Sequence, residues 1–598
     1  MTATPRARFD DLVSGRALRC PPPHSVLVAH RPEDVVPLLT EVDRASAEGD
    51  WAFGYVGYEA AAGLDPALPV FLPSTDGPPL AWFGLCGPPT AAPVVAAVRG
   101  DRPAARWVPD WTAEEHSRAV ARVRAHIAAG DTYQLNLTDR LRAQVDGDLD
   151  ALYAGLALAQ RGAYNAHLDL GRYVIASASP ELFFQWDGAA RLLTRPMKGT
   201  APRGRTSAED AQQVDRLLGS EKERAENVMI VDLLRNDLGQ IADVGSVRVP
   251  RLLTPERYES VWQLTSDVTA DVRPGTGLVE VFRALFPSGS VTGAPKQRTM
   301  ELISDLEAEP RGVYCGAIGV VAPPGHPYRA RFNVAIRTVT VDRTTASAVY
   351  GTGGGITWSS EPDAEHRELL TKTLVLTEPH EEFALIETMA HVPDRGLRHL
   401  DRHLARLADS ARYFGFRLDL PAARSRLGDA VRYAGPARVR LTLHRDGSLD
   451  VDVAPLPVPS RRPVRLTVDR EPVDSRQRWL HHKTTRRSEY SARAARHPEA
   501  DDVVLVNERD EVTETTIANL AVQLEGRWFT PPLTAGCLPG VERGRLLDQG
   551  RLAERVLTTA DLGAADGLAV LSSLRGWRPA VLLGLTPEPD AGQPSSGT

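Results

Sequence analysis

The stretch EKERAENVMIVDLLRNDLG, residues 221–239, is one of the two clearest helices that the sequence predicts. An apolar run, VMIVDLL, occupies its centre, and acidic residues flank that run on both sides. On a helix, Glu226 lies one turn beyond Glu223, so both carboxylates share one face. Spacing alone favours a charged surface face for these residues, with a ligand site as the alternative.

The segments around this helix predict a large α+β unit. WTAEEHSRAVARVRAHIAAGD (111–131) has apolar residues at helical spacing, and Gly130 stops it. RYVIASASPELFFQW (172–186) and RARFNVAIRTVTV (329–341) have the pattern of strands. The first 110 residues alternate short apolar runs with Gly and Pro, for which strands and turns are the simplest interpretation.

A second unit begins after the short polar segment TEPHEE. FALIETM then predicts a strand, and LRHLDRHLARLADSARYFGF an amphipathic helix. The C-terminal TPEPDAGQPSSGT is rich in Pro, Gly and Ser, which predicts disorder. The expected organisation is an N-terminal part (1–110), a first catalytic domain (111–376), a linker (377–382), a second domain (383–585) and a tail (586–598).

Composition indicates a globular enzyme rather than a nucleic-acid or membrane protein. The 598 residues include 70 basic and 77 acidic side chains, for a net charge of −7. Four cysteines lie far apart without CxxC spacing, as in a reducing compartment. No signal pattern and no apolar run of about 18 residues is present, so we expect a cytoplasmic protein.

Two further stretches of the first unit carry residues suited to chemistry. RPMKGTAPRGR (195–205) places Lys198 between a proline and a glycine, where a desolvated amine could act as nucleophile or base. GTGGGITWSSEPDAEHRELLTK (351–372) joins a Gly-rich turn to an acidic helix. Glu368 and Lys372 could be a simple surface ion pair, or they could hold a metal and a substrate carboxylate. Each stretch alone is weak evidence.

Taken together, these segments resemble the chorismate-utilising enzymes, the family of anthranilate, aminodeoxychorismate and isochorismate synthases. The resemblance covers about residues 50–375 and implies an α+β, anthranilate synthase component I-like fold with large antiparallel sheets. The matching motifs, in the family's order, are GDTYQLNLTDR (130–140), SPELF (179–183), RPMKGT (195–200), ERAENVMIVDLLRNDLG (223–239), FPSGSVTGAPKQRTMELI (286–303), RGVYCGAIG (311–319), FNVAIRT (332–338), GTGGGI (351–356) and EHRELLTK (365–372).

The resemblance implies a role for each matching position. Two glutamates correspond to Mg²⁺ ligands, one residue to the general acid, and six residues to contacts with the substrate. These are Glu226 and Glu368 for the metal, Glu181 for the acid, and Tyr314, Arg337, Gly353, Gly354, Gly355 and Lys372 for the substrate.

Three positions bear on which branch of the family the chain resembles. Gln134 stands where water-adding members have a lysine base, and it is counted with the substrate contacts. Lys198 stands where aminodeoxychorismate synthases have a lysine and anthranilate synthases an alanine, which implies a covalent lysine and amination at C4. Gln263, in VWQLTS, replaces a histidine common in the family, and this departure leaves its role open.

Four fragments of the second unit, HHKTTRRSEY (481–490), NERDEVTETTIANL (507–520), TPPLTAGCLPGVERGRLL (530–547) and SSLRGWRPA (572–580), resemble the fold-type IV enzymes that use pyridoxal 5′-phosphate (PLP). That resemblance, over about 383–582, implies an α/β domain. It implies that Lys483 carries PLP, that Glu514 pairs with its ring nitrogen, and that Arg406, Val541 and Ser573 bind its phosphate. Glu542 departs from the usual threonine and is not counted. The basic stretch 461–497 favours a solvated face, with a site for an anionic substrate or cofactor as the alternative and nucleic acid as a third, less favoured one.

The two resemblances together imply amination of chorismate to 4-amino-4-deoxychorismate, followed by loss of pyruvate to give 4-aminobenzoate. No cysteine stands in a glutaminase motif, so the ammonia would come from a separate glutaminase subunit or from solution. A homodimer is expected only by analogy with fold-type IV enzymes. Two alternatives stay open: an aminating domain fused to an amino-acid transaminase, and a non-catalytic scaffold that binds chorismate.

Overall fold

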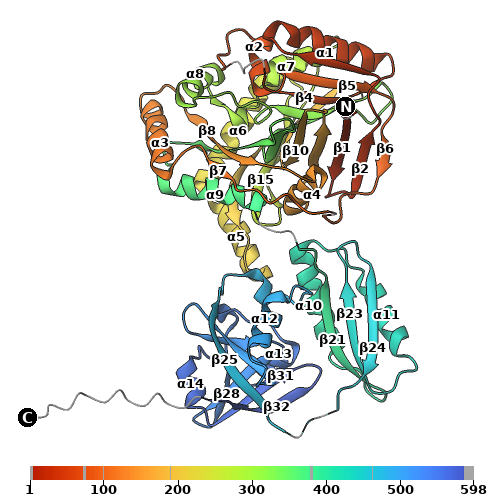
Figure 1. Cartoon of the computed structure of the whole chain (residues 1–598), viewed down its shortest axis with the longest axis vertical. Coiled ribbons are helices and arrows are strands. Elements are labelled where there is room, and N and C mark those ends of the chain that lie inside the picture. Colours follow the sequence, from red (N-terminus) through yellow and green to blue (C-terminus); the bar gives the residue numbers. More distant parts are fainter. Residues whose placement is uncertain are drawn as a thin grey trace, which may run out of the picture. The chain divides into compact units, whose positions relative to one another are not determined.

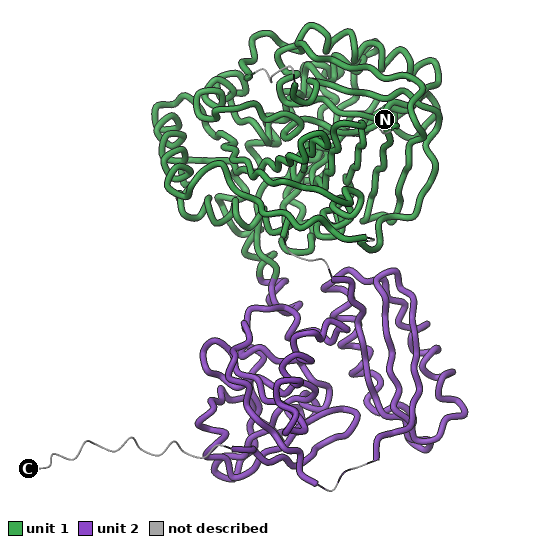
Figure 2. The backbone as a smooth tube through the Cα atoms, viewed as in Figure 1, with its two compact units in different colours: residues 1–203, 213–380 green, residues 204–212, 381–598 purple. Residues whose placement is uncertain are grey.

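The computed structural model divides into two compact units, residues 1–203 with 213–380 and residues 204–212 with 381–598 (Figure 2). It describes residues 4–71, 76–98, 100–188, 190–377, 381–458, 460 and 462–584. The predicted tail and half of the predicted linker, residues 378–380, fall outside these ranges. Among the described residues, no helix combines the length and the apolar character needed to cross a membrane.

The first unit is built on two ten-stranded antiparallel sheets (Figure 1). One runs in the order β16 (Gly293–Ala294), β8 (Gln134–Gln144), β20 (Ser347–Ile356), β19 (Thr338–Asp342), β10 (Tyr173–Ser179), β9 (Tyr164–Asp169), β1 (Arg6–Asp11), β2 (Arg16–Cys20) and β6 (Thr90–Ala92), with β7 (Val108–Pro109) on β8. The other runs β13 (Met197–Pro202), β15 (Val261–Asp271), β12 (Arg191–Arg195), β11 (Leu182–Asp187), β18 (Tyr328–Val334), β17 (Ala317–Val321), β4 (Trp51–Val56), β5 (Ala81–Cys86) and β3 (Ser25–Ala29), with β14 (Arg248–Arg257) on β15.

Helices of the first unit pack on these sheets and on each other. They are α1 (Pro32–Ala47), α2 (Ala61–Leu64), α3 (Ala113–Ala128), α4 (Leu149–Gln160), α6 (Glu221–Gly239), α7 (Leu278–Leu285), α8 (Lys296–Leu306) and α9 (Pro362–Thr377), while α5 (Ser207–Gly219) spans the border between the units. The helices predicted within 111–131 and over 221–239 are confirmed as α3 and α6.

The prediction of only strands and turns before residue 110 is wrong for α1. Pro32 begins this helix, and Asp34 accepts a hydrogen bond from the Arg31 backbone N–H at 3.2 Å. Its buried residues, which include Val35, Leu39 and Val42, recur at helical spacing and face the core. The Gly- and Pro-rich character of the surrounding segment hid this pattern.

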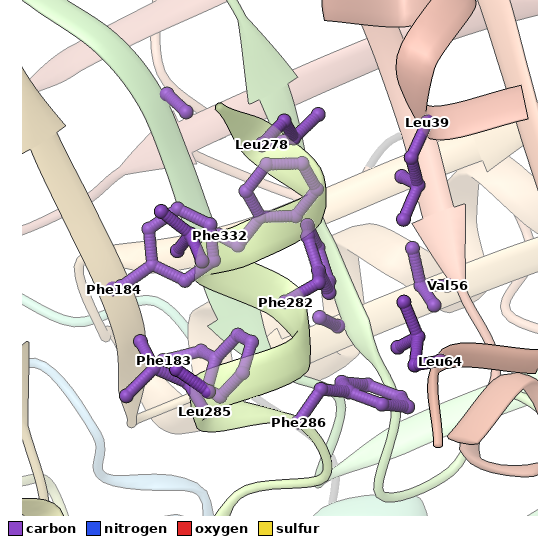
Figure 3. Packing of buried hydrophobic residues seen from close by; sticks show 14 of the residues in the cluster. Leu39, Val56, Leu64, Phe183, Phe184, Leu278, Phe282, Leu285, Phe286 and Phe332 are labelled. Atoms are coloured by element: carbon purple, nitrogen blue, oxygen red, sulfur yellow. The ribbon is translucent and has the colours of Figure 1, made fainter. Parts of the chain in front are cut away.

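A cluster of aromatic side chains forms the centre of the core in the first unit (Figure 3). Phe282, on α7, lies with its ring centroid 5.6 Å from that of Phe184 and 5.3 Å from that of Phe332, both edge-to-face. Edge-to-face pairs stabilise by about 0.5–1.5 kcal/mol beyond the area they bury. Because Phe184 lies three residues after Glu181, this packing holds β11, the strand that begins directly after the candidate acid.

The second unit holds two sheets. A four-stranded antiparallel sheet has the order β22 (Gly396–Leu397), β21 (Leu385–Val392), β23 (Ala437–Leu443) and β24 (Leu449–Pro455). A mixed eight-stranded sheet has the order β27 (Val512–Thr515), β26 (Asp502–Asn507), β25 (Val464–Val473), β32 (Gly576–Leu582), β31 (Gly567–Ser572), β28 (Asn519–Leu524), β29 (Arg527–Thr530) and β30 (Ala553–Glu554). The helices are α10 (Leu400–Phe414), α11 (Leu420–Val431), α12 (Ser488–Arg496), α13 (Val541–Asp548) and α14 (Thr559–Gly563).

Candidate active sites

A cavity of about 170 Å³ in the first unit brings together most of the residues that the sequence predicts for its site. The predicted residues that line it are Glu181, Lys198, Glu226, Tyr314, Arg337, Gly353, Gly354, Gly355, Glu368 and Lys372. Gln134 lies just behind its wall, next to Gly355. Segments from almost 200 residues of chain therefore converge on one pocket.

Lys198 enters this cavity from β13, and the backbone around it is tightly held. The side-chain amide of Asn227, on α6, donates a hydrogen bond of 3.0 Å to the carbonyl of Lys198. Ser266 in turn donates to the other end of the Asn227 amide at 2.6 Å. Gly199 has a φ of 99°, which a residue with a side chain rarely adopts. The glycine after Lys198 thus turns the chain so that the amine points inward.

Gln134 and Lys198 meet at Gly355. A Cβ atom added to Gly355 would lie 2.5 Å from Nε2 of Gln134 and 2.6 Å from Nζ of Lys198. Gln134 is fully buried, and its amide nitrogen and oxygen have no hydrogen-bond partner within the described part of the chain. Buried polar atoms are normally paired, so this amide has hydrogen-bonding capacity free for a ligand or for the lysine. Only glycine at position 355 leaves room for both groups.

Glu181 is a buried carboxyl group on the cavity wall. Burial raises its pKa to about 7, although a hydrogen bond from Ser290 and the charge of Lys198 oppose the rise. Its backbone N–H donates to the Ser179 hydroxyl at 3.2 Å, which fixes the start of β11. A carboxyl group with a pKa near neutrality can give up a proton to a leaving group, as the sequence resemblance implies.

Four glutamates from two helices face the same cavity. Glu223 and Glu226 come from α6, and Glu365 and Glu368 come from α9. Burial raises the pKa of Glu223, Glu226 and Glu365, whereas Lys372, 2.8 Å from Glu368, lowers the pKa of that residue. The sequence-based prediction did not include Glu365, and it assigned no role in the site to Glu223. The signal was present, because each helix carries two glutamates three residues apart that share a face.

A second group of residues suits an anion. Arg337 donates to Oε1 of Gln160 at 3.2 Å, and Lys372 donates to the carbonyl of Gly353 at 2.8 Å. Arg337 has a φ of 52°, a conformation that costs energy for a residue with a side chain and often marks functional sites. Gln263 also lines the cavity, where it accepts a hydrogen bond of 3.2 Å from the Thr200 hydroxyl.

A second cavity, of about 300 Å³, lies within the second unit. The predicted residues Arg406, Lys483, Glu514, Val541 and Ser573 all line it. Burial, together with the charges of Arg406 and Arg487, lowers the pKa of Lys483 to about 8. The Lys483 carbonyl accepts a hydrogen bond of 3.0 Å from the backbone of Ile386, which ties the lysine to β21. This amine is thus far easier to deprotonate than an exposed lysine.

Glu514 is held by three donors that the sequence prediction left without a role. The hydroxyl of Tyr490 donates to Oε1 at 3.1 Å, and the amide of Asn519 and the backbone N–H of Leu538 donate to Oε2 at 3.1 and 3.2 Å. Burial nevertheless raises the pKa of Glu514 to about 7. The carboxyl group therefore suits a short hydrogen bond to a basic nitrogen.

A buried chain of charged groups supports the other end of this cavity. Glu387 accepts hydrogen bonds of 2.9 and 2.7 Å from Arg406 and lies 2.6 Å from Nδ1 of His403. Nε2 of His403 lies 2.7 Å from the Ser573 hydroxyl. Burial opposes ionisation of Glu387, but Arg406 and His403 outweigh it and hold its pKa at about 2. Glu387 and His403, which the sequence prediction missed, thus hold Arg406 and Ser573 in place.

Glu387→Gln is expected to weaken the binding of PLP by about tenfold or more, because a neutral amide cannot hold both Arg406 and His403. The dissociation constant can be measured by absorbance titration of the cofactor-free chain. Glu525→Gln, at an exposed turn outside the cavity, is the matched control. An unchanged affinity for PLP in Glu387→Gln would show that Arg406 and Ser573 need no such support.

Family comparisons agree with this division of the chain. Residues 90–378 match the model of the chorismate binding enzymes, and residues 384–583 match that of the class IV amino-transferases. The chain joins a chorismate-binding domain to a class IV aminotransferase domain. Both are enzyme families, and the second domain has the fold of PLP enzymes.

Two curated relatives each match slightly less than half of the chain. Anthranilate synthase component 1 of Streptomyces coelicolor is 41% identical over 283 residues, which are 47% of this chain and 54% of that protein. Aminodeoxychorismate synthase component 1 of Salmonella typhimurium is 39% identical over 275 residues, 46% of this chain and 59% of that protein. The chain thus spans little more than half the length of these relatives.

A solved structure confirms the fold expected for the chorismate-binding domain. Anthranilate synthase component I from Streptococcus pneumoniae superposes with a TM-score of 0.53 at 24% identity, over 62% of this chain and 93% of that one. At this level of identity the likeness concerns the fold alone. The choice between products therefore depends on residues of the cavity.

Proposed function

We propose that the chorismate-binding domain aminates chorismate at C4 and that the aminotransferase-like domain releases pyruvate, giving 4-aminobenzoate. The observation that carries the first step is the place of Lys198, whose amine lies beside Gln134 and Gly355 in the cavity. The relatives include both anthranilate and aminodeoxychorismate synthases, so their names do not select the product. The resemblance of the motif around Lys198 favours amination at C4, because it implies a lysine where anthranilate synthases have alanine.

The proposed amination has two balanced steps. Nζ of Lys198 bonds to ring C2, the ring double bonds shift, and the C4–O bond breaks as Glu181 gives a proton to the departing hydroxyl. Ammonia then bonds to C4, and the C2–N bond to Lys198 breaks, which restores the free amine. Splitting one displacement into two in this way is covalent catalysis. Gln134, with its free amide, is placed to orient the lysine.

The glutamates of the same cavity fit a magnesium ion. Mg²⁺ takes oxygen ligands, keeps several waters and needs only one or two protein carboxylates. Within the described ranges no three of the carboxylates are close enough together to share one ion. Substrate and water would complete the shell around Glu226 and Glu368. A bound Mg²⁺ would neutralise the ring carboxylate and orient the ring.

Amination should depend on pH through Glu181. A general acid must carry its proton, and burial raises the pKa of Glu181 to about 7, so the competent fraction falls as pH rises through about 7. We expect kcat/KM for chorismate to drop about tenfold per pH unit above that value. Glu181→Gln should be much slower and should lose this limb of the profile. A wild-type profile that stays flat from about pH 6 to 8.5 would contradict the assignment.

The residues of the second cavity fit PLP. Arg406, Ser573 and the N-terminus of α13 suit the phosphate, Glu514 suits the pyridine nitrogen, and Lys483 suits the aldehyde. PLP, when bound, supplies an electron sink next to the substrate nitrogen. Lys483, with a pKa of about 8, can take the proton from ring C4. Loss of this proton and of the enolpyruvyl group as pyruvate makes the ring aromatic.

Ammonia would come from a separate glutaminase subunit or from solution, and a homodimer through the second domain stays an expectation by analogy. The alternatives, a transaminase second domain and a non-catalytic scaffold, predict other products. Analysis of the products that the purified chain makes from chorismate and ammonium, with and without PLP, tests the proposal.

A further inference from the structure

The second cavity is lined by more positive charge than its proposed cofactor requires. Seven basic and two acidic side chains line it. Arg406 is paired with Glu387, and Arg486 is paired with Glu381 at 3.2 Å. These two pairs leave four arginines and Lys483 to consider.

Arg487 donates a hydrogen bond to the backbone carbonyl of Thr516. The other three arginines have no carboxylate within ion-pair distance in the described ranges. Arg440, Arg575 and Arg578 form no ion pair with any residue in the described ranges, and we name them the rim arginines. The Nε atom of Arg578 is buried and finds no hydrogen-bond acceptor among the same residues. Burial and the neighbouring charge of Arg575 lower the pKa of Arg578, while the charges of Asp502 and Asp501 partly oppose this shift. Positive side chains gathered around one cavity repel one another, and an anion bound there would offset this repulsion.

The nearby carboxylates are already engaged elsewhere. Asp501 pairs with Arg465 at 3.2 Å, and Asp502 accepts hydrogen bonds of 2.6 Å from the hydroxyls of Thr515 and Thr516. Within the cavity, Glu542 pairs with Arg545 at 2.7 Å. Glu514 is held by Tyr490, Asn519 and Leu538, as described above. In the described ranges no carboxylate forms an ion pair with a rim arginine, although the more distant charges of Asp502 and Asp501 act favourably on Arg578.

The rim arginines come from two different sheets. Arg440 lies on β23, paired in register with Thr388 of β21, and Thr388 also lines the cavity. Arg575 and Arg578 lie at the turn and on the second strand of the β31–β32 hairpin. Figure 1 shows β23 and the β31–β32 pair in separate sheets of this unit. The cavity thus has two positive centres on two walls.

We propose that the rim arginines make this domain selective for a substrate with two separate carboxylates, one facing Arg440 and one facing Arg575 and Arg578. The inference rests on the proposed lyase function and deepens it, because 4-amino-4-deoxychorismate carries a ring carboxylate and an enolpyruvyl carboxylate. An amino acid with an apolar side chain carries one carboxylate and would leave one centre uncompensated. The arginines therefore select the lyase substrate over ordinary transaminase substrates.

Two probes test this selectivity in the full-length chain loaded with PLP. 3-(Carboxymethoxy)benzoate has a ring carboxylate and an ether-linked carboxylate, whereas 3-methoxybenzoate has only the first. Their dissociation constants are measured from the change in the PLP absorbance band, which does not report binding to the chorismate domain. We expect the dicarboxylate to bind at least about tenfold more tightly, since a charge-assisted hydrogen bond contributes roughly that factor.

Arg440→Gln, Arg575→Gln and Arg578→Gln should each reduce this ratio severalfold and raise KM for 4-amino-4-deoxychorismate. Arg575 is exposed, so its variant tests the site without disturbing the core. Arg551→Gln, outside the cavity and also exposed, is the control and should keep the wild-type ratio. The inference is overturned if the wild type binds the two probes equally well, or if the ratio of their dissociation constants is unchanged in all three variants. This holds even if pyruvate is released. A ratio that the variants abolish supports it even if the wild type releases no pyruvate, in which case only the lyase proposal fails.

Discussion

Lys198→Ala should lower the formation of 4-amino-4-deoxychorismate by about 1,000-fold or more, because the covalent step has no other nucleophile. The sequence contains five lysines, and only Lys198, Lys222 and Lys372 line the first cavity. Lys372 is paired with Glu368 at 2.8 Å, and Lys222 lies 4.0 Å from Glu226. The amine of Lys198 is the one that lies beside Gln134 and Gly355.

Chromatography of the products from chorismate, Mg²⁺ and ammonium measures this effect. Lys198→Arg keeps the positive charge without the nucleophile, so it should be as inactive as Lys198→Ala. Lys296→Arg is the matched control, because Lys296 lines neither cavity and its ion pair with Asp237 can be kept. A small anthranilate-type product from Lys198→Ala is compatible with the role proposed. Full formation of 4-amino-4-deoxychorismate by that variant would refute it.

Lys483→Ala should stop the pathway at 4-amino-4-deoxychorismate and remove the absorbance band of protein-bound PLP. Lys483 is the only lysine between residues 381 and 598, so no other lysine of that domain can replace it. Its pKa of about 8 leaves a usable fraction of free amine near neutral pH. We expect the formation of 4-aminobenzoate to fall by about 1,000-fold or more, with amination unchanged, since the two cavities lie in different units.

Borohydride reduction followed by peptide mass spectrometry locates the attachment site independently of activity. The expected label lies on the peptide that contains Lys483 and is absent from Lys483→Ala. Arg486→Lys is the matched control, since it adds a nearby amine without removing Lys483. A label on another lysine, or an unchanged absorbance band in Lys483→Ala, would contradict the assignment.

Sequence patterns predicted the reactive residues better than they predicted the residues that hold them in position. Lys198, Glu226 and Lys483 stand in ordered motifs, so their place in a cavity could be anticipated. The role of Glu387 could not be anticipated, because it depends on hydrogen bonds with Arg406 and His403. Glu387 lies on β21 and its two partners lie on α10, so they meet only after folding. The same holds for the rim arginines, because the sequence does not reveal which arginines are without an ion pair in the described structure.

In some segments, different local sequence patterns predict different secondary structures. The helix α1 has a clear apolar stripe, but it lies in a segment whose glycines and prolines favour turns. Residues 204–212 belong to the second compact unit although they lie deep in the first stretch of the chain. That assignment depends on contacts such as the 2.6 Å hydrogen bond from the Tyr413 hydroxyl to the carbonyl of Gly204. A separation of 209 residues leaves no trace in a local pattern.

Product analysis is the sharpest test of the two-step reaction. Purified chain is incubated with chorismate, Mg²⁺ and an ammonium salt, once loaded with PLP and once stripped of it, with a chelator as a third condition. We expect 4-aminobenzoate and pyruvate in equal amounts with PLP, 4-amino-4-deoxychorismate alone without PLP, and neither product when the metal is removed. Accumulation of 4-amino-4-deoxychorismate despite bound PLP, or anthranilate as the main product, would contradict it.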